Sequence, residues 1–462
     1  MILSLVLAAT PAWAVRPTEG GLFRFEAADD VVYWDEPRGR VRVWYAKSGP
    51  SVVRAGDSDG DGVPDFVTQV GDTAELVFEH VEALGFRLPL FEAALDLGPV
   101  GGSPAFDLYL VDFGGSADGA FGVDACDDAG HCSGYLSMEN DFAGYGYSSM
   151  TAAIHTLVSH ELFHGVQAAY ARDLPVWFSE GTATWAEVSF DPDSEDFRRF
   201  ANVYLADAGR SLDRPPAGPV PAFAYSTALF WDFLSLRHGD GFVVALLEGV
   251  ETPDGSVADT LAVVQSALEL EGDDLAVAWP VFAAWNLATG RRAGAAEGYP
   301  YADDLRGVGL EIEAGATIDE DVRVFPLGSV YAELAHTGGP LWVAADEGAP
   351  ELAFSVHEEG AGGAVGDAVA AWTGVGARAE VGDLPAGTYA IAISLPARLE
   401  ESVKVRLCFG DEAWVGDCEP VDTDPPDTEV GDPPGRGCDG AQAPTGLWLF
   451  ALVALARRRL VR

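Results

Sequence analysis

Lysine is nearly missing from this chain. Among its 462 residues, Lys47 and Lys404 are the only lysines, and 73 acidic residues outnumber 27 basic ones, which gives a formal net charge of −46. A polyanion of this kind repels nucleic acids and acidic lipids, so we expect no nucleic-acid partner. The hydrophobic content of 48% is ordinary for a globular protein. The length permits a large core and predicts two or three domains.

Cysteine is also scarce, with five residues in the whole chain. Cys126 and Cys132 are close in sequence, as are Cys408 and Cys418, so each pair could close a small loop in an oxidising compartment. A zinc site formed by Cys126, His131 and Cys132 is the alternative for the first pair, although its spacing matches no common zinc knuckle.

The apolar run at the N-terminus is too short to span a membrane, which takes roughly 20 residues. Residues 1–14 contain the run Leu3 to Ala9 and end in Ala-Trp-Ala, the small-x-small pattern of a signal-peptide cleavage site. No basic residue precedes the run. We expect a signal peptide at 1–14, with a buried first strand as the alternative.

The motif that says most about function is His-Glu-Leu-Phe-His at 160–164, followed by Trp-Phe-Ser-Glu-Gly at 177–181. Two histidines four residues apart project from one face of a helix, so His160 and His164 can bind one zinc ion. Glu161 lies where it can take a proton from a zinc-bound water, and Glu180 would be the third protein ligand.

The residues around this motif predict two helices joined by a short turn. Apolar residues recur at three- and four-residue spacing through the motif, and Ser148 or Ser149 can cap the first helix. This helix should end near Ala171, because Pro175 disfavours helical backbone in the residue before it. The second helix begins around Pro175 and can bring Glu180 back against the first.

His-Glu-x-x-His followed by Trp-x-x-Glu-Gly-x-Ala resembles the signature of the gluzincin clan of zinc metallopeptidases. The match covers residues 160–187. Thr184 stands where the thermolysin branch has an aspartate that supports a zinc histidine, and Glu187 falls where many gluzincins keep a second glutamate. The roles that the resemblance implies are zinc ligation by His160, His164 and Glu180, and general base catalysis by Glu161.

The resemblance implies two further elements of the site. Gluzincins often keep a tyrosine on a helix beyond the glutamate ligand, and its hydroxyl stabilises the oxyanion of the tetrahedral intermediate. Tyr225, at the start of an aromatic-rich helical segment over 225–234, is the candidate, with a packing tyrosine as the alternative. Residues 106–113 and 134–140 predict strands. In gluzincins an edge strand at the second position pairs with the substrate backbone.

A second metal motif occupies residues 57–68. Aspartates stand at positions 1, 3, 5 and 9 of a calcium loop, Gly62 falls at the sharp turn, and the carbonyl of the seventh residue can be a ligand. Position 12 is Thr68 and not glutamate, so the loop resembles the aspartate-rich calcium repeats of extracellular proteins. A solvated acidic turn is the alternative. The predicted calcium ligands are Asp57, Asp59, Asp61, Val63 and Asp65.

Residues 308–418 predict a β-sandwich. Short β-rich runs at 341–343, 352–356, 388–393 and 403–407 are separated by Gly and Pro at the spacing of a sandwich. Leu-Pro-Ala-Gly-Thr-Tyr, which begins at Leu384, resembles a turn in the β-domains appended to secreted bacterial peptidases. After this domain, residues 419–437 are rich in Pro, Asp and Gly and predict an extended linker.

The last segment, 438–462, combines Cys438 with a short apolar run and a cluster of three arginines at 457–459. Together with the N-terminus, it resembles the ends of secreted metalloproteases of myxobacteria, whose tail is a sorting signal. The resemblance implies interaction with the membrane or with sorting machinery, processing near Cys438, and delivery to the cell surface. A plain tail anchor or an amphipathic end is the alternative.

These patterns predict an α+β protein in which a zinc metallopeptidase domain over 15–307, with a mixed sheet and a helical half, precedes the β-sandwich. The expected function is that of a secreted or cell-surface zinc endopeptidase, which hydrolyses protein or peptide substrates by means of a glutamate-activated, zinc-bound water. The expected cofactors are Zn²⁺ and Ca²⁺. The alternatives are a zinc aminopeptidase and a non-catalytic surface adhesin with a relict zinc site.

Overall fold

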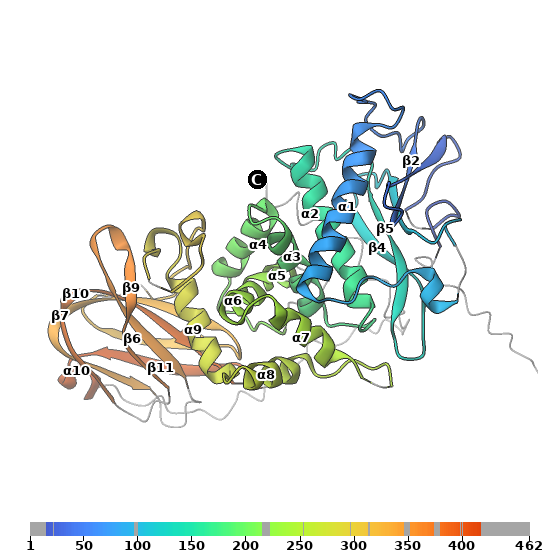
Figure 1. The fold of residues 1–462 in the computed structure, drawn as a ribbon. Coiled ribbons are helices and arrows are strands. Elements are labelled where there is room, and N and C mark those ends of the chain that lie inside the picture. The colour runs from blue at the N-terminus through green and yellow to red at the C-terminus, as the bar shows by residue number, and fades with distance from the viewer. Residues whose placement is uncertain are drawn as a thin grey trace, which may run out of the picture. The chain divides into compact units, whose positions relative to one another are not determined.

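The computed structural model shows an α+β protein with two sheets (Figure 1). It describes residues 15–416, apart from 22, 97–99, 215–221, 253, 296, 313–314, 346–351, 374–378, 398 and 400. The predicted signal peptide, linker and tail lie outside the described residues. Contacts divide the chain into two compact units. Residues up to 201 and 216–271 form the first, and residues 202–215 with those from Gly272 onwards form the second. The sequence had suggested a division at 307/308.

A five-stranded mixed sheet, in the order β1-β2-β3-β5-β4, belongs to the first unit. Its central pairs are parallel and its outer pairs antiparallel. β3 and β5 confirm the strands predicted at 106–113 and 134–140. β5 is not an edge strand, however, because the chain doubles back through a tight hairpin and places β4 outside β5. The strands are β1 (Val31–Asp35), β2 (Val41–Ala46), β3 (Phe106–Val111), β4 (Gly119–Cys126) and β5 (Cys132–Glu139).

The helices of the first unit include the two predicted around the zinc motif. α2 begins after Ser149, whose hydroxyl accepts a hydrogen bond from the N–H of Ala152 at 3.0 Å, and α3 begins after Pro175. α2 packs against β4 and β5 of the sheet. The helices are α1 (Asp65–Leu84), α2 (Met150–Ala168), α3 (Val176–Phe190), α4 (Glu195–Ala206, which reaches the second unit), α5 (Ala222–Ser226), α6 (Ala228–His238), α7 (Gly241–Val250) and α8 (Thr260–Leu270).

The segment predicted as one helix over 225–234 is two helices, α5 and α6, which meet at Thr227. The Thr227 hydroxyl lies 2.6 Å from the carbonyl oxygen of Trp177 and 2.8 Å from that of Ala224. A threonine side chain that hydrogen-bonds to backbone competes with continuous helix. The contact with Trp177 joins this break to the start of α3, which carries Glu180.

The second unit contains one antiparallel sheet of six strands in the order β6-β11-β7-β10-β8-β9, and α9 packs on it. All four predicted β-rich runs fall on these strands, although the run at 352–356 begins one residue before β8. Their bounds are β6 (Ile318–Val324), β7 (Ser329–Ala345), β8 (Ala353–Glu359), β9 (Val365–Thr373), β10 (Ala379–Ser394) and β11 (Val403–Gly410), and the helices are α9 (Leu275–Leu287) and α10 (Glu412–Gly416).

The predicted sandwich of two sheets is therefore a single hydrogen-bonded sheet that folds over on itself. Phe354 of β8 and Phe409 of β11 are separated by two strands in the sheet order, yet their ring centroids are 6.1 Å apart. Gly338 and Gly339 lie in the middle of β7 with φ of 93° and 104°, a backbone region that favours glycine and lets the long strand bend. Turn signals in the sequence mark strand ends but not which strands share hydrogen bonds.

Cys126 and Cys132 form the disulfide that the sequence predicts, at the hairpin between β4 and β5. The alternative zinc site is wrong, because the two sulfur atoms bind each other and His131 contacts Asp127 and Glu251 instead. Cys408 lies on β11, and its predicted partner Cys418 lies outside the described residues. Across 15–416, with the gaps given above, no helix is both long and apolar enough to cross a membrane.

Candidate zinc site

α2 and α3 bring together the three residues predicted to bind zinc. The Nε2 atom of His160 lies 3.4 Å from an Oε atom of Glu180, and the Nε2 atom of His164 lies 3.6 Å from the same oxygen. His160 and Glu180 are buried, and His164 is half-buried. One atom from each residue can therefore face a common point, as a metal site requires.

The other nitrogen of His160 is held by Glu187, one of the residues that the gluzincin resemblance pointed to. Nδ1 of His160 lies 2.9 Å from the Glu187 carboxylate, so an Nδ1–H donates there and the Nε2 atom faces Glu180. Thr184 has no carboxylate to offer, but Glu187 lies one turn further along the same helix. Glu187 therefore orients the ring of His160.

Gln167 orients the second histidine, and the sequence reasoning missed it. Its side-chain N–H groups donate to the carbonyl oxygen of Ser179 and to the Thr182 hydroxyl, both at 2.8 Å. The amide oxygen of Gln167 is thereby turned to accept from Nδ1 of His164, at 2.8 Å. The position of Gln167 three residues after His164 could have indicated this role, because residues three apart are neighbours on a helix surface.

Glu161 lies between the helix and the edge strand β4. A Cβ atom built on Gly119 would come within 2.8 Å of the Glu161 carboxylate, so only glycine leaves this carboxylate its present place. The backbone N–H of Phe121, also on β4, donates to Glu161. β4 is therefore the strand beside Glu161, a place that was predicted for residues 134–140.

Tyr225 is placed at the site, as predicted. Its ring stacks between those of His160, at 5.7 Å, and Phe200, at 5.0 Å. Its hydroxyl hydrogen-bonds to Glu180, and burial together with the charges of Glu180 and Glu161 raises the pKa of Tyr225 well above its usual value. The hydroxyl therefore keeps its proton and remains a hydrogen-bond donor at neutral pH.

Burial and charge give the two glutamates different proton affinities. Burial would raise the pKa of Glu180, but the adjacent His164 and His160 outweigh it and lower this pKa to about 2. Burial also raises the pKa of Glu161, and here the same histidines do not outweigh it. Burial would lower the pKa of His160, but Glu180 and Glu187 outweigh this effect and raise the pKa well above its usual value. Glu180 thus keeps its charge, whereas Glu161 accepts a proton more readily.

The donor atoms of His160, His164 and Glu180 are of the types that bind a zinc ion. Two imidazole Nε2 lone pairs and one ionised carboxylate are the ligands of a catalytic zinc site with an open position. One Glu180 oxygen is buried and makes no hydrogen bond. This oxygen faces the two histidine Nε2 atoms at 3.4 and 3.6 Å, and a cation held between Glu180 and the two histidines would give it a closer partner.

Gly181 explains why Glu180 reaches this place. A Cβ atom at Gly181 would lie 2.1 Å from the Thr227 hydroxyl and 2.5 Å from Nε1 of Trp231. α3 therefore approaches the break between α5 and α6 closely, and the glycine next to the ligand permits this. Trp177 and Trp231 stack at 5.1 Å beside this contact.

The loop at 57–68 gathers three of its predicted calcium ligands. Carboxylate oxygens of Asp57, Asp59 and Asp61 lie within 4.8 Å of one another, and all three residues are exposed. Asp65 is turned elsewhere, because its carboxylate accepts from the N–H and the hydroxyl of Ser58, each at 3.0 Å. The N–H of Val63 donates to Asp61 at 2.8 Å. The loop ends in the first turn of α1.

Comparisons with known proteins assign no function. No protein-family model matches the chain, and no curated protein is similar to it in sequence. One similar solved structure is a periplasmic inhibitor of g-type lysozyme from Aeromonas hydrophila, with 20% identity, a TM-score of 0.18, and coverage of 22% of this chain and 98% of that chain. Another is an aminopeptidase A from Legionella pneumophila in complex with aspartic acid, with 15% identity and a TM-score of 0.33. That match covers 82% of this chain but 36% of the aminopeptidase.

Proposed function

We propose that this protein is an exported zinc-dependent endopeptidase. The observation that carries the proposal is the paired support of the two histidines. Glu187 and Gln167 occupy their Nδ1 atoms and thereby direct both Nε2 atoms toward the Glu180 carboxylate. Hydrogen bonds that fix the second nitrogen of each imidazole in this way are typical of histidines that bind a metal, and packing alone does not need them.

His160, His164 and Glu180 would hold the zinc. When bound, zinc polarises a peptide carbonyl and makes an attacking water more acidic at neutral pH. Glu161, with one buried oxygen that makes no hydrogen bond, takes the proton from the attacking water and passes it to the leaving nitrogen. The Tyr225 hydroxyl donates a hydrogen bond to the oxygen on which negative charge develops. The free edge of β4 can hydrogen-bond to an extended peptide backbone.

An endopeptidase is favoured over an aminopeptidase by the place of Glu139. This residue belongs to the Met-Glu-Asn sequence at 138–140, which matches the Gly-x-Met-Glu-Asn exopeptidase motif of the aminopeptidase branch only in part, because Leu136 stands where the motif has glycine. Its carboxylate is buried and accepts from the N–H of Phe113 at 3.0 Å, on the interior strand β5. A substrate amino group held by this motif would need Glu139 beside the reactive centre, on the edge strand.

Export is supported by the disulfide between Cys126 and Cys132, since disulfides persist in oxidising compartments. We also propose that the loop at 57–68 binds Ca²⁺ through Asp57, Asp59 and Asp61, as extracellular modules do. We further propose that the segment 438–462 directs delivery of the protein to the cell surface. The released protein would then act on protein or peptide substrates outside the cell.

Two substitutions test the zinc site. Glu161→Gln should retain one zinc per chain and lose at least about a hundredfold in turnover of a general protein substrate, because it removes a base and not a ligand. Glu180→Ala should lose zinc itself. Metal analysis and casein hydrolysis of both purified variants provide the measurement, with Glu195→Gln on the exposed start of α4 as the control.

The control should match the wild type in zinc content and in hydrolysis. Full zinc occupancy in Glu180→Ala would remove Glu180 from the ligand set. A wild type that binds zinc but hydrolyses neither casein nor a library of unblocked peptides would favour the adhesin. Cleavage confined to the N-terminal residue of those peptides would favour the aminopeptidase.

A further inference from the structure

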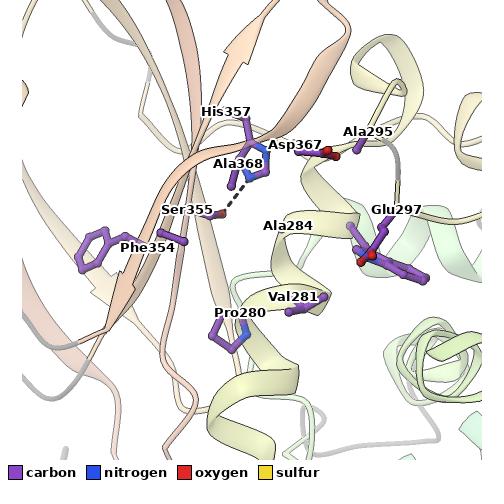
Figure 2. A pocket seen from close by; sticks show the side chains of 12 residues that line it. Pro280, Val281, Ala284, Ala295, Glu297, Phe354, Ser355, His357, Asp367 and Ala368 are labelled. Atoms are coloured by element: carbon purple, nitrogen blue, oxygen red, sulfur yellow. Dashed lines mark hydrogen bonds between the residues drawn. The ribbon is translucent and has the colours of Figure 1, made fainter. Parts of the chain in front are cut away.

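A cavity of about 350 Å³ lies in the second unit, between α9 and the end of the sheet formed by β8 and β9 (Figure 2). Cavities of roughly 300–1,000 Å³ are the usual size of ligand pockets. Most of its wall is apolar. The apolar side chains come from both elements and are Pro280, Val281, Ala284, Trp285, Phe354, Ala368 and Ala371.

Two buried polar residues of β8, Ser355 and His357, line the same cavity. They lie two positions apart on the strand and therefore on one face of the sheet. Nδ1 of His357 is 3.0 Å from the carbonyl oxygen of Gly366, and Nε2 is 3.0 Å from the Ser355 hydroxyl (Figure 2). A carbonyl oxygen only accepts, so Nδ1 carries the proton and Nε2 accepts the proton of Ser355. Burial lowers the pKa of His357, which agrees with a neutral ring.

This arrangement leaves the Ser355 oxygen with lone pairs and no proton to offer a ligand. Asp367 on β9 and Glu297 on the loop after α9 also line the cavity, and both are exposed. Figure 2 shows His357, Asp367 and Glu297 around one part of the cavity, with Pro280 and Val281 of α9 at another. Ionised carboxylates only accept hydrogen bonds. The polar side chains that face the cavity thus offer acceptors, and the two carboxylates favour a positive charge.

The apolar walls and the anionic rim together fit a cation on an aliphatic stem. Arginine and lysine side chains have this form, since their methylene groups cover apolar surface while the charged end remains at a polar rim. The indole of Trp285 adds an aromatic face, which attracts cations. β9 forms the end of the sheet, with β8 as its strand neighbour among the described residues. Its outer edge can therefore hydrogen-bond to an extended backbone.

We propose that this cavity binds an arginine or lysine side chain of an extended peptide, which lies along β9. The proposal concerns the second unit and does not depend on whether the zinc site hydrolyses peptides. If both proposals hold, this site would select or retain basic polypeptides, to which a chain with a net charge of −46 is electrostatically complementary.

Calorimetric titration of the full chain carrying Glu161→Gln tests the proposal, because this substitution prevents cleavage. The probe is the pentapeptide acetyl-Ala-Ala-Arg-Ala-Ala-amide, and its neutral counterpart carries citrulline in place of arginine. The arginine peptide should bind at least tenfold more tightly than the citrulline peptide. Adding Glu297→Gln and Asp367→Asn should weaken its binding at least tenfold.

Two controls separate this site from the general charge of the protein and from the zinc site. Glu380→Gln with Asp383→Asn removes the same charge from exposed positions of β10 and should leave binding unchanged. Ala284→Trp keeps every charge but fills the cavity and should abolish binding, whereas a peptide held at the zinc site would still bind this variant. Three results would overturn the proposal. They are undiminished binding to Ala284→Trp, equal binding of the two peptides, and tighter binding of free agmatine than of the arginine peptide.

Discussion

At the scale of single residues, the neighbours of a side chain decide its chemistry. Glu180, Glu161 and Glu139 are all buried glutamates, yet the pKa of Glu180 falls to about 2 beside His164 and His160, whereas that of Glu139 rises to about 7. The difference follows from the partners, because imidazoles stabilise a carboxylate and nearby carboxylates such as Asp112 and Asp141 do not. Three identical side chains therefore differ in how readily they hold a proton, which fits the roles of ligand and base proposed for Glu180 and Glu161.

Replacing Tyr225 by phenylalanine tests its role in the reaction. Tyr225→Phe removes the hydroxyl but keeps the ring that stacks on His160 and Phe200. A single donor to a developing oxyanion is worth about 3–4 kcal/mol, so kcat should fall roughly a hundredfold or more with KM little changed. Zinc content and Tm should stay near those of the wild type. A nearly normal kcat would make Tyr225 a packing residue.

Glu139 should make the stability of the protein depend on pH. The Tyr145 hydroxyl lies 2.5 Å from the carbonyl oxygen of Ala117, which only accepts, and 3.0 Å from the Glu139 carboxyl group. Burial, partly offset by hydrogen bonds from Phe113 and Tyr145, raises the pKa of Glu139 from 4.5 to about 7.

The folded state therefore holds this proton more tightly than the unfolded state. The contribution of Glu139 to stability is largest below pH 4.5 and falls as pH rises to about 7. Glu139→Gln does not titrate, so relative to the wild type it should gain on the order of 2–3 kcal/mol between pH 4.5 and 8. Urea unfolding at both pH values measures the difference, with the exposed Glu195→Gln as control. A constant difference between variant and wild type would show that Glu139 titrates normally.

At the scale of the elements, the site depends on how closely α3 approaches its neighbours. The proposed metal ligand Glu180 and its neighbour Glu187, which holds His160, both lie on α3, while the histidines lie on α2. The contact of Thr227 with Trp177 and the absence of a side chain at Gly181 set the position of α3 against α5 and α6. The break at Thr227 is therefore part of the support of the zinc site.

Gly181→Ala tests this packing. The added methyl group would lie 2.1 Å from the Thr227 hydroxyl, so α3 must shift or the neighbours must give way. Overpacking of this kind costs about 1–3 kcal/mol, and we expect a lower Tm together with weaker zinc binding because Glu180 moves with the helix. Thermal unfolding and zinc titration with a competing chelator measure both effects. Gly241→Ala, at the start of α7 with open space around its Cβ position, is the control and should change neither.

At the scale of the whole molecule, the net charge of −46 makes any cation stabilise the folded chain to some extent by screening. The stabilisation that a specific calcium site provides must therefore exceed this general screening effect. The candidate loop precedes α1, and the backbone N–H groups of Gly60 and Gly62 donate to Asp57 at 2.8 and 3.0 Å. These bonds hold the loop so that the carboxylates of Asp57, Asp59 and Asp61 lie close together.

Calcium should therefore raise Tm more than magnesium does at the same ionic strength. Extracellular calcium modules bind with Kd of about 0.1–1 mM, so a few millimolar calcium should add about 1–2 kcal/mol. Asp59→Ala combined with Asp61→Ala should remove the difference between the two ions. If the double variant responds to calcium as the wild type does, the calcium ligands lie elsewhere in the chain.

Several features of this protein could be predicted from the sequence because short-range physics determines them. The helical repeat places His160 and His164 on one face, the Ser149 hydroxyl caps α2, and Pro175 begins α3. The disulfide between Cys126 and Cys132 also joins residues close in sequence. Each of these depends on residues within a few positions of one another, where spacing and stereochemistry leave few alternatives.

Other features were decided only by the tertiary structure. β4 and not β5 is the edge strand, the six strands of the second unit share one sheet, and Gln167 turns its amide oxygen to His164 because Ser179 and Thr182 occupy its N–H groups. Strand order and amide orientation depend on contacts between segments whose separation in sequence carries no periodic signal. The sequence alone therefore determined which residues can form the zinc site, and packing between distant elements decided how they are held.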